Sequence, residues 1–469
     1  MESISYNSGL ARRVTEDIYR LRDKAVSEEV LRAATSCVVD FFAVILAALR
    51  EPLSIEVKRC INRLGGIPEA TVLSDGTRTS APLAALVNGT QAHAQDYDDT
   101  LWTYIGHSTS VIFPASLAVA EAVACSGREL LAAFALGVET AHCIGSPVTP
   151  KLSELGWHPT PSVGVFGAAA ASSLIMGADV RVTSSALTIA TNMAAGIRQN
   201  FGSKAKPLVI GLASHSGVMA ALFAQQGISG SEEAFEGKQG FYMAYAGSSS
   251  DSFEEARDDE LALLSPGVAF KLYPCCTGTH PTIDAILMIQ KECSLTPDEI
   301  ASIAIEVTPE VLGELIYPIP SNGAEARFSL PYCAAAALVY KGVELRHFGE
   351  EFLKDPKITT LMQRIRVRPN EELVRHGGDH CPAARVAVIT HEGKRIQRTV
   401  HVARGNPGNP ISFDELKGKF YHCAATAGLS GKKTERLLQR IMGIPKASDV
   451  RTWMAMEVSP FLKGLVAKR

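Results

Sequence analysis

Helical stretches rich in alanine, glycine and serine fill the first half of the chain and constrain its fold more than any other feature. From about residue 8 to residue 264 the pattern is almost entirely helical, and most stretches end at a glycine, as helix C-termini often do. Examples are ASLAVAEAVACSG, ELLAAFALGVETAHCIG, GVFGAAAASSLIMGA and SHSGVMAALFAQQG. Because small side chains let helix axes approach closely, we expect a tightly packed, all-helical domain.

One stretch near the N-terminus predicts a central helix. In VSEEVLRAATSCVVDFFAVILAAL, Ser27 suits the N-cap, and Glu28 and Glu29 stand in the first turn, where the helix dipole favours acidic groups. The residues that follow are apolar on all sides. A helix of this kind is expected to be buried in the core.

The pattern changes near residues 265–267. After one more helix, HPTIDAILMIQKEC, short alternating runs rich in β-branched residues predict the strands IASIAIEVTP, RIRVRPN, ARVAVITHEG and KRIQRTVHVA. A turn around Glu392 and Gly393 would join the last two as a hairpin. Two further helices, LPYCAAAALVYKG and TTLMQRI, complete a predicted α+β region.

From Ser412 the chain returns to helix. We therefore expect a mainly α protein with a large all-helical domain built from both chain ends. Residues 1–266 would form most of this domain, residues 403–469 would rejoin it, and residues 267–402 would form a smaller inserted α+β lid.

Composition excludes several classes of protein. The 469-residue chain has a net charge of −3, which gives no indication of a nucleic-acid surface. Its ten cysteines include no C-x-x-C pair, so they predict free thiols in a reducing compartment. Residues 1–20 lack the apolar core of a signal peptide, and the most apolar segments, 36–49 and 163–178, are short. We expect a cytoplasmic protein without a membrane span.

The segment AHAQDYDDTLWTYIGHSTS, residues 91–109, carries the densest group of titratable side chains. If it is helical, spacings of three or four place six of them on one face: His93, Asp96, Tyr97, Thr100, Tyr104 and His107. A carboxylate beside an imidazole orients it and raises its pKa, as acid–base catalysis requires. The alternative is a loop of helix-capping aspartates.

Three further segments carry candidate site residues. His158 precedes Pro159 and Pro161 at a predicted helix start, where the helix dipole favours a neutral imidazole; a buried histidine bonded to the backbone is the alternative. In RQNFGSKAKPLVIG, the cations interrupt apolar sequence before a strand-like run and would need an anionic partner, unless they are surface side chains. These cations are Arg198, Lys204 and Lys206.

The third segment, SPGVAFKLYPCCTGTHPTIDA, contains Lys271, Cys275, Cys276 and His280. Adjacent cysteines cannot easily supply two ligands to one tetrahedral ion, and an iron–sulfur cluster needs more cysteines, so we predict no metal. No dinucleotide-binding or phosphate-binding glycine motif occurs in the chain.

Taken together, NGTQAHAQDYDDT, GWHPT, KAKPLVIG and FKLYPCCTGTHPTIDA resemble the MmgE/PrpD family. That family includes 2-methylcitrate dehydratases, cis-aconitate decarboxylases and an iminodisuccinate epimerase. The resemblance runs through most of the chain in the same order. It implies a large helical domain from both chain ends, a smaller α+β lid, a homodimer, and catalysis without a metal or organic cofactor.

The resemblance also assigns site residues by motif. The matching positions are Asp96 and Thr100 of D-[FY]-D-D-T, His107 after it, His158 of G-W-H, Lys206 of K-P and Lys271 before [FY]-P. In the decarboxylases the residues at these positions line the pocket for the carboxylate substrate. The chain departs from the family twice: Ser108 stands where proline often follows the histidine, and Cys276 stands where animal decarboxylases carry an active-site histidine.

These residues imply chemistry at a proton next to a carboxylate. Lys206 and Lys271 would clamp substrate carboxylates, one of His107 and His158 would be the base and the other the acid, and Asp96 would orient His107. Weaker substrate-binding candidates are Thr100, Lys204, Arg198, Cys276 and His280.

We expect a cofactor-independent lyase acting on a small di- or tricarboxylate, foremost a dehydratase of a citrate-like hydroxy acid. The alternatives are an epimerase or a decarboxylase using the same site, and a non-catalytic protein that binds carboxylates or serves as a scaffold.

Overall fold

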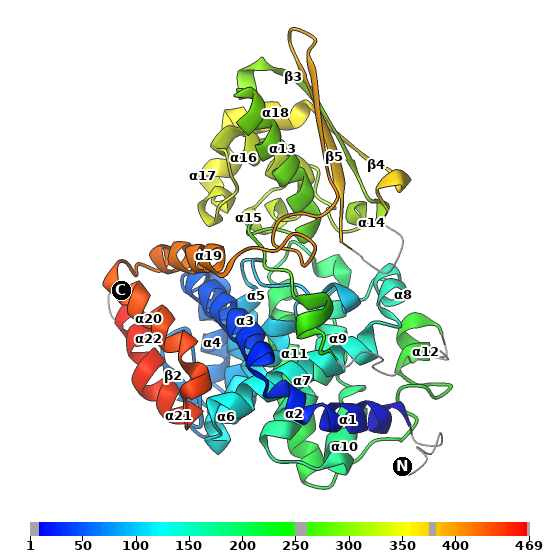
Figure 1. Ribbon diagram of the computed structural model, residues 1–469, viewed down its shortest axis with the longest axis vertical. Helices are drawn as coiled ribbons and strands as arrows, with labels where there is room; N and C mark the ends of the chain where they lie inside the picture. Colours follow the sequence, from blue (N-terminus) through cyan, green and yellow to red (C-terminus); the bar gives the residue numbers. More distant parts are fainter. Residues whose placement is uncertain (1–8, 249–259, 375–380, 467–469) are drawn as a thin grey trace.

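The computed structural model describes residues 9–248, 260–374 and 381–466. Two parts are stacked along its long axis: a large helical body below, and a smaller domain above in which strands lie beside helices (Figure 1). Each part has a hydrophobic core of its own. The protein is mainly α-helical with a small mixed sheet, as predicted.

The helical body consists of helices from both ends of the described chain. Its main helices are α1 (Leu10–Arg20), α3 (Glu28–Ala47), α4 (Pro52–Asn62), α5 (Ala81–His93), α6 (Ser108–Val123), α7 (Gly127–Gly145), α9 (Pro159–Ile175), α10 (Val180–Ala190), α11 (Ala205–Gln225), α19 (Phe413–Thr426), α20 (Lys432–Met442) and α22 (Ser459–Val466). Shorter helices are α2 (Arg22–Ala25), α8 (Thr149–Glu154), α12 (Phe241–Ala246) and α21 (Val450–Trp453). A hairpin of β1 (Ala70–Val72) and β2 (Thr77–Thr79) was not predicted, because three-residue strands leave little pattern.

Helix starts follow the capping signals in the sequence. Ser27 accepts a hydrogen bond from the backbone N–H of Val30, so it caps the central helix α3 as predicted. Ser126 and Glu129 form a reciprocal capping box at α7. Such caps satisfy backbone N–H groups that would otherwise lack partners, and each contributes about 1 kcal/mol.

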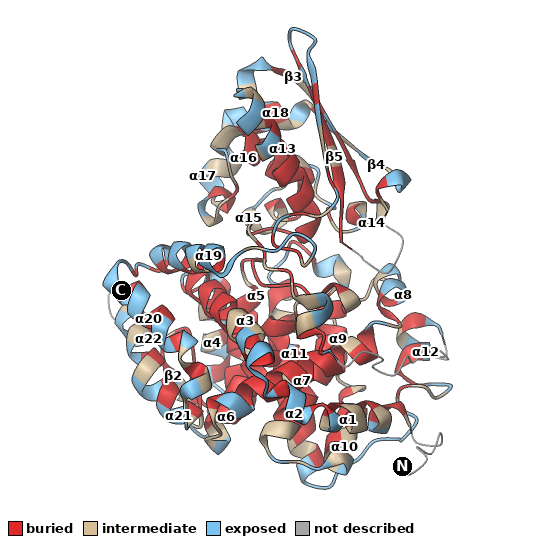
Figure 2. Cartoon of the chain, viewed as in Figure 1, coloured by how far each residue is buried: buried red, intermediate tan, exposed pale blue. Residues whose placement is uncertain are grey.

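Glycines let the central helices pack with their backbones almost in contact. A Cβ added at Gly137 of α7 would lie 2.7 Å from the carbonyl oxygen of Gly167 in α9, and one at Gly167 would lie 2.5 Å from that of Gly137. Gly211 of α11 lies equally close to the backbone of α5. Figure 2 shows α5, α7 and α9 almost entirely buried. The tight packing expected from small residues is present.

Two helices, α3 and α11, are long and apolar enough to cross a membrane. In the structure both belong to the helical body, where 78% of the apolar window of α3 and 56% of that of α11 are buried. Packing in a protein core accounts for the apolar character of α3, since it contacts α5, α6, α7 and α19.

The smaller domain has a four-stranded sheet in the order β4-β3-β5-β6. Its elements are β3 (Ile300–Val307), β4 (Ile365–Pro369), β5 (Ala384–Thr390), β6 (Arg395–Val400), α13 (His280–Cys293), α14 (Pro309–Leu312), α15 (Gly323–Ala326), α16 (Leu330–Tyr340), α17 (Glu350–Leu353) and α18 (Pro356–Gln363). Strands β3 and β4 are parallel and the other pairs antiparallel. All four predicted strands and the β5–β6 hairpin are present.

The chain passes between the two parts at two points that lie side by side. The backbone N–H of Phe270 donates to the carbonyl of Gly405 at 2.9 Å. The first crossing also pairs with the helical body, since Thr100 and Ala269 exchange backbone hydrogen bonds of 2.9 and 2.8 Å. This pairing places Lys271, two residues further on, at the junction of the two parts.

The C-terminal helix α19 packs on α3 in the helical body. Nζ of Lys419 lies 2.6 Å from Oδ1 of Asp40, and both side chains are almost completely buried. Phe420 and Cys423 of α19 belong to the same core as α3. Figure 1 shows α19 beneath the smaller domain, beside the end of α3 in this view.

Two local predictions were wrong. Helix α5 ends at His93, so the six side chains of residues 93–107 do not form a stripe on one helix. The next residues turn because Asp96 adopts φ of 51°, which a continuing right-handed helix excludes. The apolar run after Lys206, expected to be strand-like, forms the first turns of α11, where Pro207 suits the helix start and the run packs on α5.

Candidate active site

A cavity at the junction of the two parts collects eight of the ten side chains that the sequence singled out. They are Asp96, Thr100, His107, His158, Arg198, Lys206, Lys271 and Cys276. They come from the loop after α5, the start of α9, the segment leading into α11, and the first crossing with the residues after it. Ligand sites are often found at junctions of this kind, where two parts of a fold can enclose a small molecule.

The loop between α5 and α6 forms one wall of the cavity. Asp96 and Ile105 both have φ of 51°, a left-handed conformation that costs a non-glycine residue roughly 1–2 kcal/mol. Backbone hydrogen bonds between Leu101 and Gly106 close the loop, and the pairing of Thr100 with Ala269 anchors it to the crossing. Strain of this kind persists where the surroundings hold it, often at functional sites.

Asp96 lies between two lysines. Nζ of Lys206 is 2.7 Å from Oδ1 of Asp96, and Nζ of Lys271 is 3.3 Å from Oδ2 and 2.9 Å from the backbone oxygen. Burial alone would raise the pKa of Asp96, but Lys206 and Lys271 hold it well below its usual range. The pKa of Asp98 is also held well below its usual range, so the two lysines face two carboxylates, and the ammonium groups of Lys206 and Lys271 are the cations that an anionic substrate can contact.

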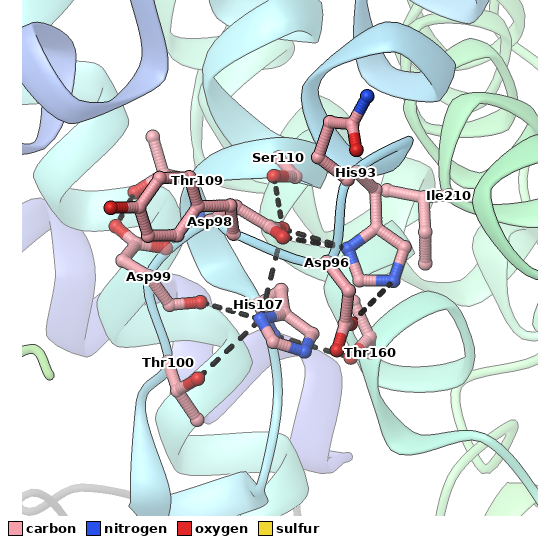
Figure 3. Close-up of polar contacts among 12 residues, drawn as sticks. His93, Asp96, Asp98, Asp99, Thr100, His107, Thr109, Ser110, Thr160 and Ile210 are labelled. Carbon is pink, nitrogen blue, oxygen red and sulfur yellow. Dashed lines mark hydrogen bonds and ion pairs between the residues drawn. The ribbon is translucent and has the colours of Figure 1, made fainter. Parts of the chain in front are cut away.

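His93 links the lysines to a second aspartate. Its Nδ1 lies 2.8 Å from Oδ2 of Asp98 (Figure 3). Its Nε2 lies 2.7 Å from Nζ of Lys206. Because an ammonium group only donates, Nε2 accepts and Nδ1 carries the proton towards Asp98. Burial lowers the pKa of His93, although Asp98 opposes the shift. His93 is therefore neutral and oriented at both nitrogens.

His107 presents a free basic nitrogen to the cavity. Its Nδ1 is 2.6 Å from the carbonyl oxygen of Asp99, and since a carbonyl only accepts, Nδ1 carries the proton and Nε2 the lone pair. Burial lowers the pKa of His107 to about 3, although Asp98 at 3.7 Å opposes this. At neutral pH His107 is an unprotonated base in a fixed tautomer, and Figure 3 shows the contacts that hold its ring.

His158 stands at the N-terminus of α9, directly before Pro159, as predicted. Its backbone N–H donates to Gly196, and its ring packs edge-on against Phe201, with centroids 4.9 Å apart. Burial holds the pKa of His158 well below its usual range, and Lys206 and the other two imidazoles add to this. The expected neutral imidazole is thus supported by burial and by neighbouring charge.

His93, Asp98 and His107 also bring possible metal-ligand atoms within 4.8 Å of one another. The hydrogen bonds of the two histidines are poorly suited to metal coordination. Both nitrogens of His93 are engaged, and Nδ1 of His107 must carry a proton to bond the Asp99 carbonyl, so it has no lone pair for an ion. The donor set forms a hydrogen-bonded network that orients imidazoles.

Arg198, Cys276 and Glu314 also line the cavity, and Glu314 contacts the other two. Nη1 of Arg198 donates to the backbone and side-chain oxygens of Ser153 at 3.0 Å, while its Nη2 lies 3.8 Å from Oε1 of Glu314. The thiol of Cys276 donates to Oε2 of Glu314 at 3.6 Å. Burial raises the pKa of that thiol well above its usual value, so it is protonated.

Two predicted substrate contacts lie away from the cavity. Lys204 pairs with Glu56 at 2.6 Å on the surface of the helical body. His280 is buried in the smaller domain, with Nε2 3.3 Å from the carbonyl of Cys275 and its ring against Tyr273. The hydroxyl of Tyr317 donates to the carbonyl of Phe201, so Tyr317 supports a cavity wall from behind.

Several residues of the site were not assigned a role from sequence. His93 and Asp98 lie in the segment 91–109, and their carboxylate–imidazole pairing was a readable signal there. Phe201 and Phe328 pack over Nζ of Lys206 at 5.1 and 4.9 Å, contacts that no local pattern predicts. Glu314 follows a short helix in the smaller domain and reaches the cavity only through the tertiary fold.

Comparison with known proteins places this chain in a family. Residues 12–254 match the MmgE/PrpD N-terminal domain and residues 273–442 the MmgE/PrpD C-terminal domain. The chain is 29% identical over 377 residues to the human cis-aconitate decarboxylase, covering 78% of this chain and 77% of that protein. It is 24% identical over 466 residues to the cis-aconitate decarboxylase-like protein oryM of Aspergillus oryzae, covering 94% and 95%. Its sequence and fold make this chain a member of the MmgE/PrpD family of enzymes.

Proposed function

We propose that the protein is a lyase that dehydrates a citrate-like hydroxy tricarboxylate, such as citrate or an alkylcitrate, without a cofactor. The observation that carries the proposal is the meeting, in one buried cavity, of a double-lysine cluster on Asp96 with two neutral imidazoles, His107 and His158. Lys206 and Lys271 would bind substrate carboxylates and stabilise the charge that develops when a neighbouring C–H bond breaks.

Neutral imidazoles favour dehydration over the other reactions. Elimination of water begins with removal of a proton by a base, and burial lowers the pKa values of both His107 and His158, so both imidazoles are unprotonated at neutral pH and available as the base. A two-base epimerase needs one of its two bases to hold a proton at the start. Decarboxylation needs a group that protonates the product carbanion, and needs no base.

His107 is the better supported base. The carbonyl of Asp99 fixes its tautomer, so Nε2 carries the lone pair without any reorganisation. Asp98 lies 3.7 Å from Nδ1 and would stabilise the imidazolium once the proton has been taken. A base oriented by a third group is the arrangement that efficient proton transfer requires.

Decarboxylation of a cis-aconitate-like acid is the second candidate, because the relatives reported above carry that name. The same lysines would hold the substrate carboxylates. A role as a silent carboxylate-binding protein is less consistent with the site, since binding needs the lysines but does not need oriented, neutral imidazoles. The homodimer and the cytoplasmic location remain predictions.

The test is incubation with citrate, 2-methylcitrate and cis-aconitate in deuterated water, followed by proton NMR. An alkene signal from a hydroxy acid supports dehydration. Bicarbonate release from cis-aconitate without alkene formation from the hydroxy acids replaces dehydration by the second candidate. Deuterium uptake without net loss of substrate indicates epimerisation, and no change with any acid contradicts all three.

A further inference from the structure

The site as described has two bases and lacks an assigned acid. Dehydration requires one group to accept the proton from carbon and another to protonate the hydroxyl, because hydroxide is a poor leaving group. His107 and His158 are both neutral at pH 7, for the reasons given above. Neither imidazole therefore starts the reaction with a proton to give, which is contrary to the sequence-based expectation that one would be the acid.

Most other groups around the cavity are poor acids. Asp96 is ionised, with a pKa held well below its usual range by Lys206 and Lys271. The pKa of Lys271 is itself raised: burial lowers it, but Asp96 and Asp98 outweigh burial, so its ammonium group holds its protons. The pKa of the Cys276 thiol is raised well above its usual value by burial and by Glu314.

Glu314 is the carboxyl group that remains. It follows α14 in the smaller domain and lines the same cavity as Cys276, His107 and His158. Burial raises the pKa of Glu314, and Arg198, Cys276 and Lys206 only partly reverse the shift. A bound polycarboxylate would raise it further, since a neighbouring negative charge favours the neutral form of a carboxyl group.

We propose that Glu314 is the general acid of this enzyme and protonates the substrate hydroxyl as it leaves. This role rests on the proposed dehydration. Glu314 belongs to the smaller domain and the base to the helical body, so closing the two parts around a substrate would complete the catalytic pair. An acidic side chain in a pocket for a polyanion is otherwise unfavourable, because an ionised Glu314 would repel the substrate.

The step balances without a further reactant. Nε2 of His107 takes the proton from carbon, and the electron pair of that C–H bond forms the new C=C bond. The C–O bond breaks, and its electron pair takes the Glu314 proton, so the hydroxyl departs as water. The enzyme is left with an imidazolium and a carboxylate, which return to the starting state by exchanging one proton through solvent.

The environment of Glu314 suits the carboxylate that this step creates. Nη2 of Arg198 lies 3.8 Å from Oε1, and the thiol of Cys276 donates to Oε2. Both groups stabilise negative charge on the acid after it has given up its proton. Charge-assisted contacts of this kind favour proton transfer in the transition state more than in the ground state.

The experiment compares Glu314→Gln with wild type on two substrates. One is the hydroxy acid that wild type dehydrates, citrate or 2-methylcitrate. The other is the same acid with fluorine in place of the hydroxyl, because fluoride leaves without being protonated. We expect Glu314→Gln to lower kcat on the hydroxy acid by about 10²–10⁴-fold and to leave the fluoro compound within about threefold.

Glu310→Gln is the matched control, because Glu310 is an exposed glutamate four residues away, on α14. It should resemble wild type on both substrates. Thermal melting checks that Glu314→Gln is folded, and turnover of the fluoro compound shows that its base is intact. Glu314→Asp, which keeps an acid, should recover part of the loss on the hydroxy acid.

Three other outcomes overturn the proposal. If Glu314→Gln loses activity equally on both substrates, Glu314 acts in binding or folding and is not the acid. If it loses activity on neither substrate, the acid lies elsewhere. If wild type dehydrates no hydroxy acid, the proposed function fails and the role of Glu314 fails with it. If wild type is active and Glu314→Gln is equally active, only the role of Glu314 fails.

Discussion

Nζ of Lys206 lies 2.7 Å from Oδ1 of Asp96, a buried aspartate whose backbone adopts φ of 51°. The pair joins α11 to the loop after α5 and places a cation beside His93 and within reach of the cavity. Lys271, from the first crossing, meets the other oxygen of the same carboxylate. Two ammonium groups are thus held together at the cavity, where a polyanion could bind.

Lys206→Met should raise KM and lower kcat/KM at least 100-fold, about 2.7 kcal/mol at 1.36 kcal/mol per tenfold. The substitution removes charge that the substrate meets in both the ground state and the transition state. Lys204→Met is the matched control, because Lys204 pairs with Glu56 at the surface and should leave kinetics within about twofold. Equal kinetics for the two variants would contradict the carboxylate-binding role of Lys206.

His107→Gln should lower kcat by about 10²–10⁴-fold while the melting temperature stays close to that of wild type. Glutamine keeps much of the polar contact of the imidazole but cannot accept a proton. His215→Gln, on the same helix as Lys206 but away from the cavity, serves as the control. If His158→Gln abolishes turnover while His107→Gln retains it, the base is His158.

The profile of kcat/KM against pH should lack an acidic limb near pH 6.5. The free enzyme needs its base neutral, so activity is lost only as the pH falls through the base's own pKa, which burial lowers to about 3 for His107. We therefore expect no fall in kcat/KM as the pH is lowered from about 8 to about 5, and protonation of Glu314 makes any change over this range a rise. A loss centred near pH 6.5 would show that an unshifted histidine is the base.

Asp99 should make the folded protein less stable as the pH rises. Its side chain is fully buried, and burial, with Asp40 and Asp98 nearby, raises its pKa to about 8. Between about pH 3.8 and pH 8, Asp99 holds a proton in the folded protein that it has released in the unfolded chain. The contribution of Asp99 to the free energy of unfolding is therefore fully present below about pH 3.8 and is lost as the pH rises to about 8.

Asp99→Asn imitates the protonated acid and removes that dependence. The melting temperature of the variant, relative to wild type, should therefore increase steadily from pH 5 to pH 8. Measuring both proteins at each pH cancels the contributions of the other titrating groups, including the three site histidines. A difference that stays constant over this range would mean that Asp99 is ionised in the folded protein.

The sequence predicted the fold where local pattern decides structure. The helix capped by Ser27, the four strands of the smaller domain and the turn near Gly393 all follow from side-chain periodicity and capping. The sequence-based prediction failed where a backbone turn interrupts the helical spacing of side chains. Asp96 sits at a helical spacing from His93, yet a positive φ at Asp96 sends the chain out of the helix.

Site residues could be predicted only where a local sequence pattern marks them. The lysines and histidines stood out because charge interrupted apolar sequence, although Lys204 carries the same signal as Lys206 and lies at the surface. Glu314 has no local signal, since it joins the cavity lining only once the smaller domain has folded against the helical body. Tertiary burial, rather than residue type, separates such residues from ordinary surface charges.

The buried pair of Lys419 and Asp40 should hold the C-terminal helix α19 to the body. Nζ of Lys419 lies 2.6 Å from Oδ1 of Asp40 and also donates to the carbonyl of Tyr97 at 2.7 Å, next to Asp96. Lys419→Met leaves Asp40 buried without its cation, so it should lower the free energy of unfolding by about 3–5 kcal/mol. Urea denaturation measures this loss.

Lys417→Met is the control for that loss, because Lys417 forms a partly exposed pair with Asp414 one turn away and should cost less than about 1 kcal/mol. The double variant Lys419→Met with Asp40→Asn removes both charges and should recover at least half of the loss, since an uncompensated buried charge costs more than a missing pair. Additive losses in the double variant would show that the two side chains do not interact. A recovered fold with reduced kcat would further indicate that Lys419 positions the loop that carries Asp96, through the Tyr97 carbonyl.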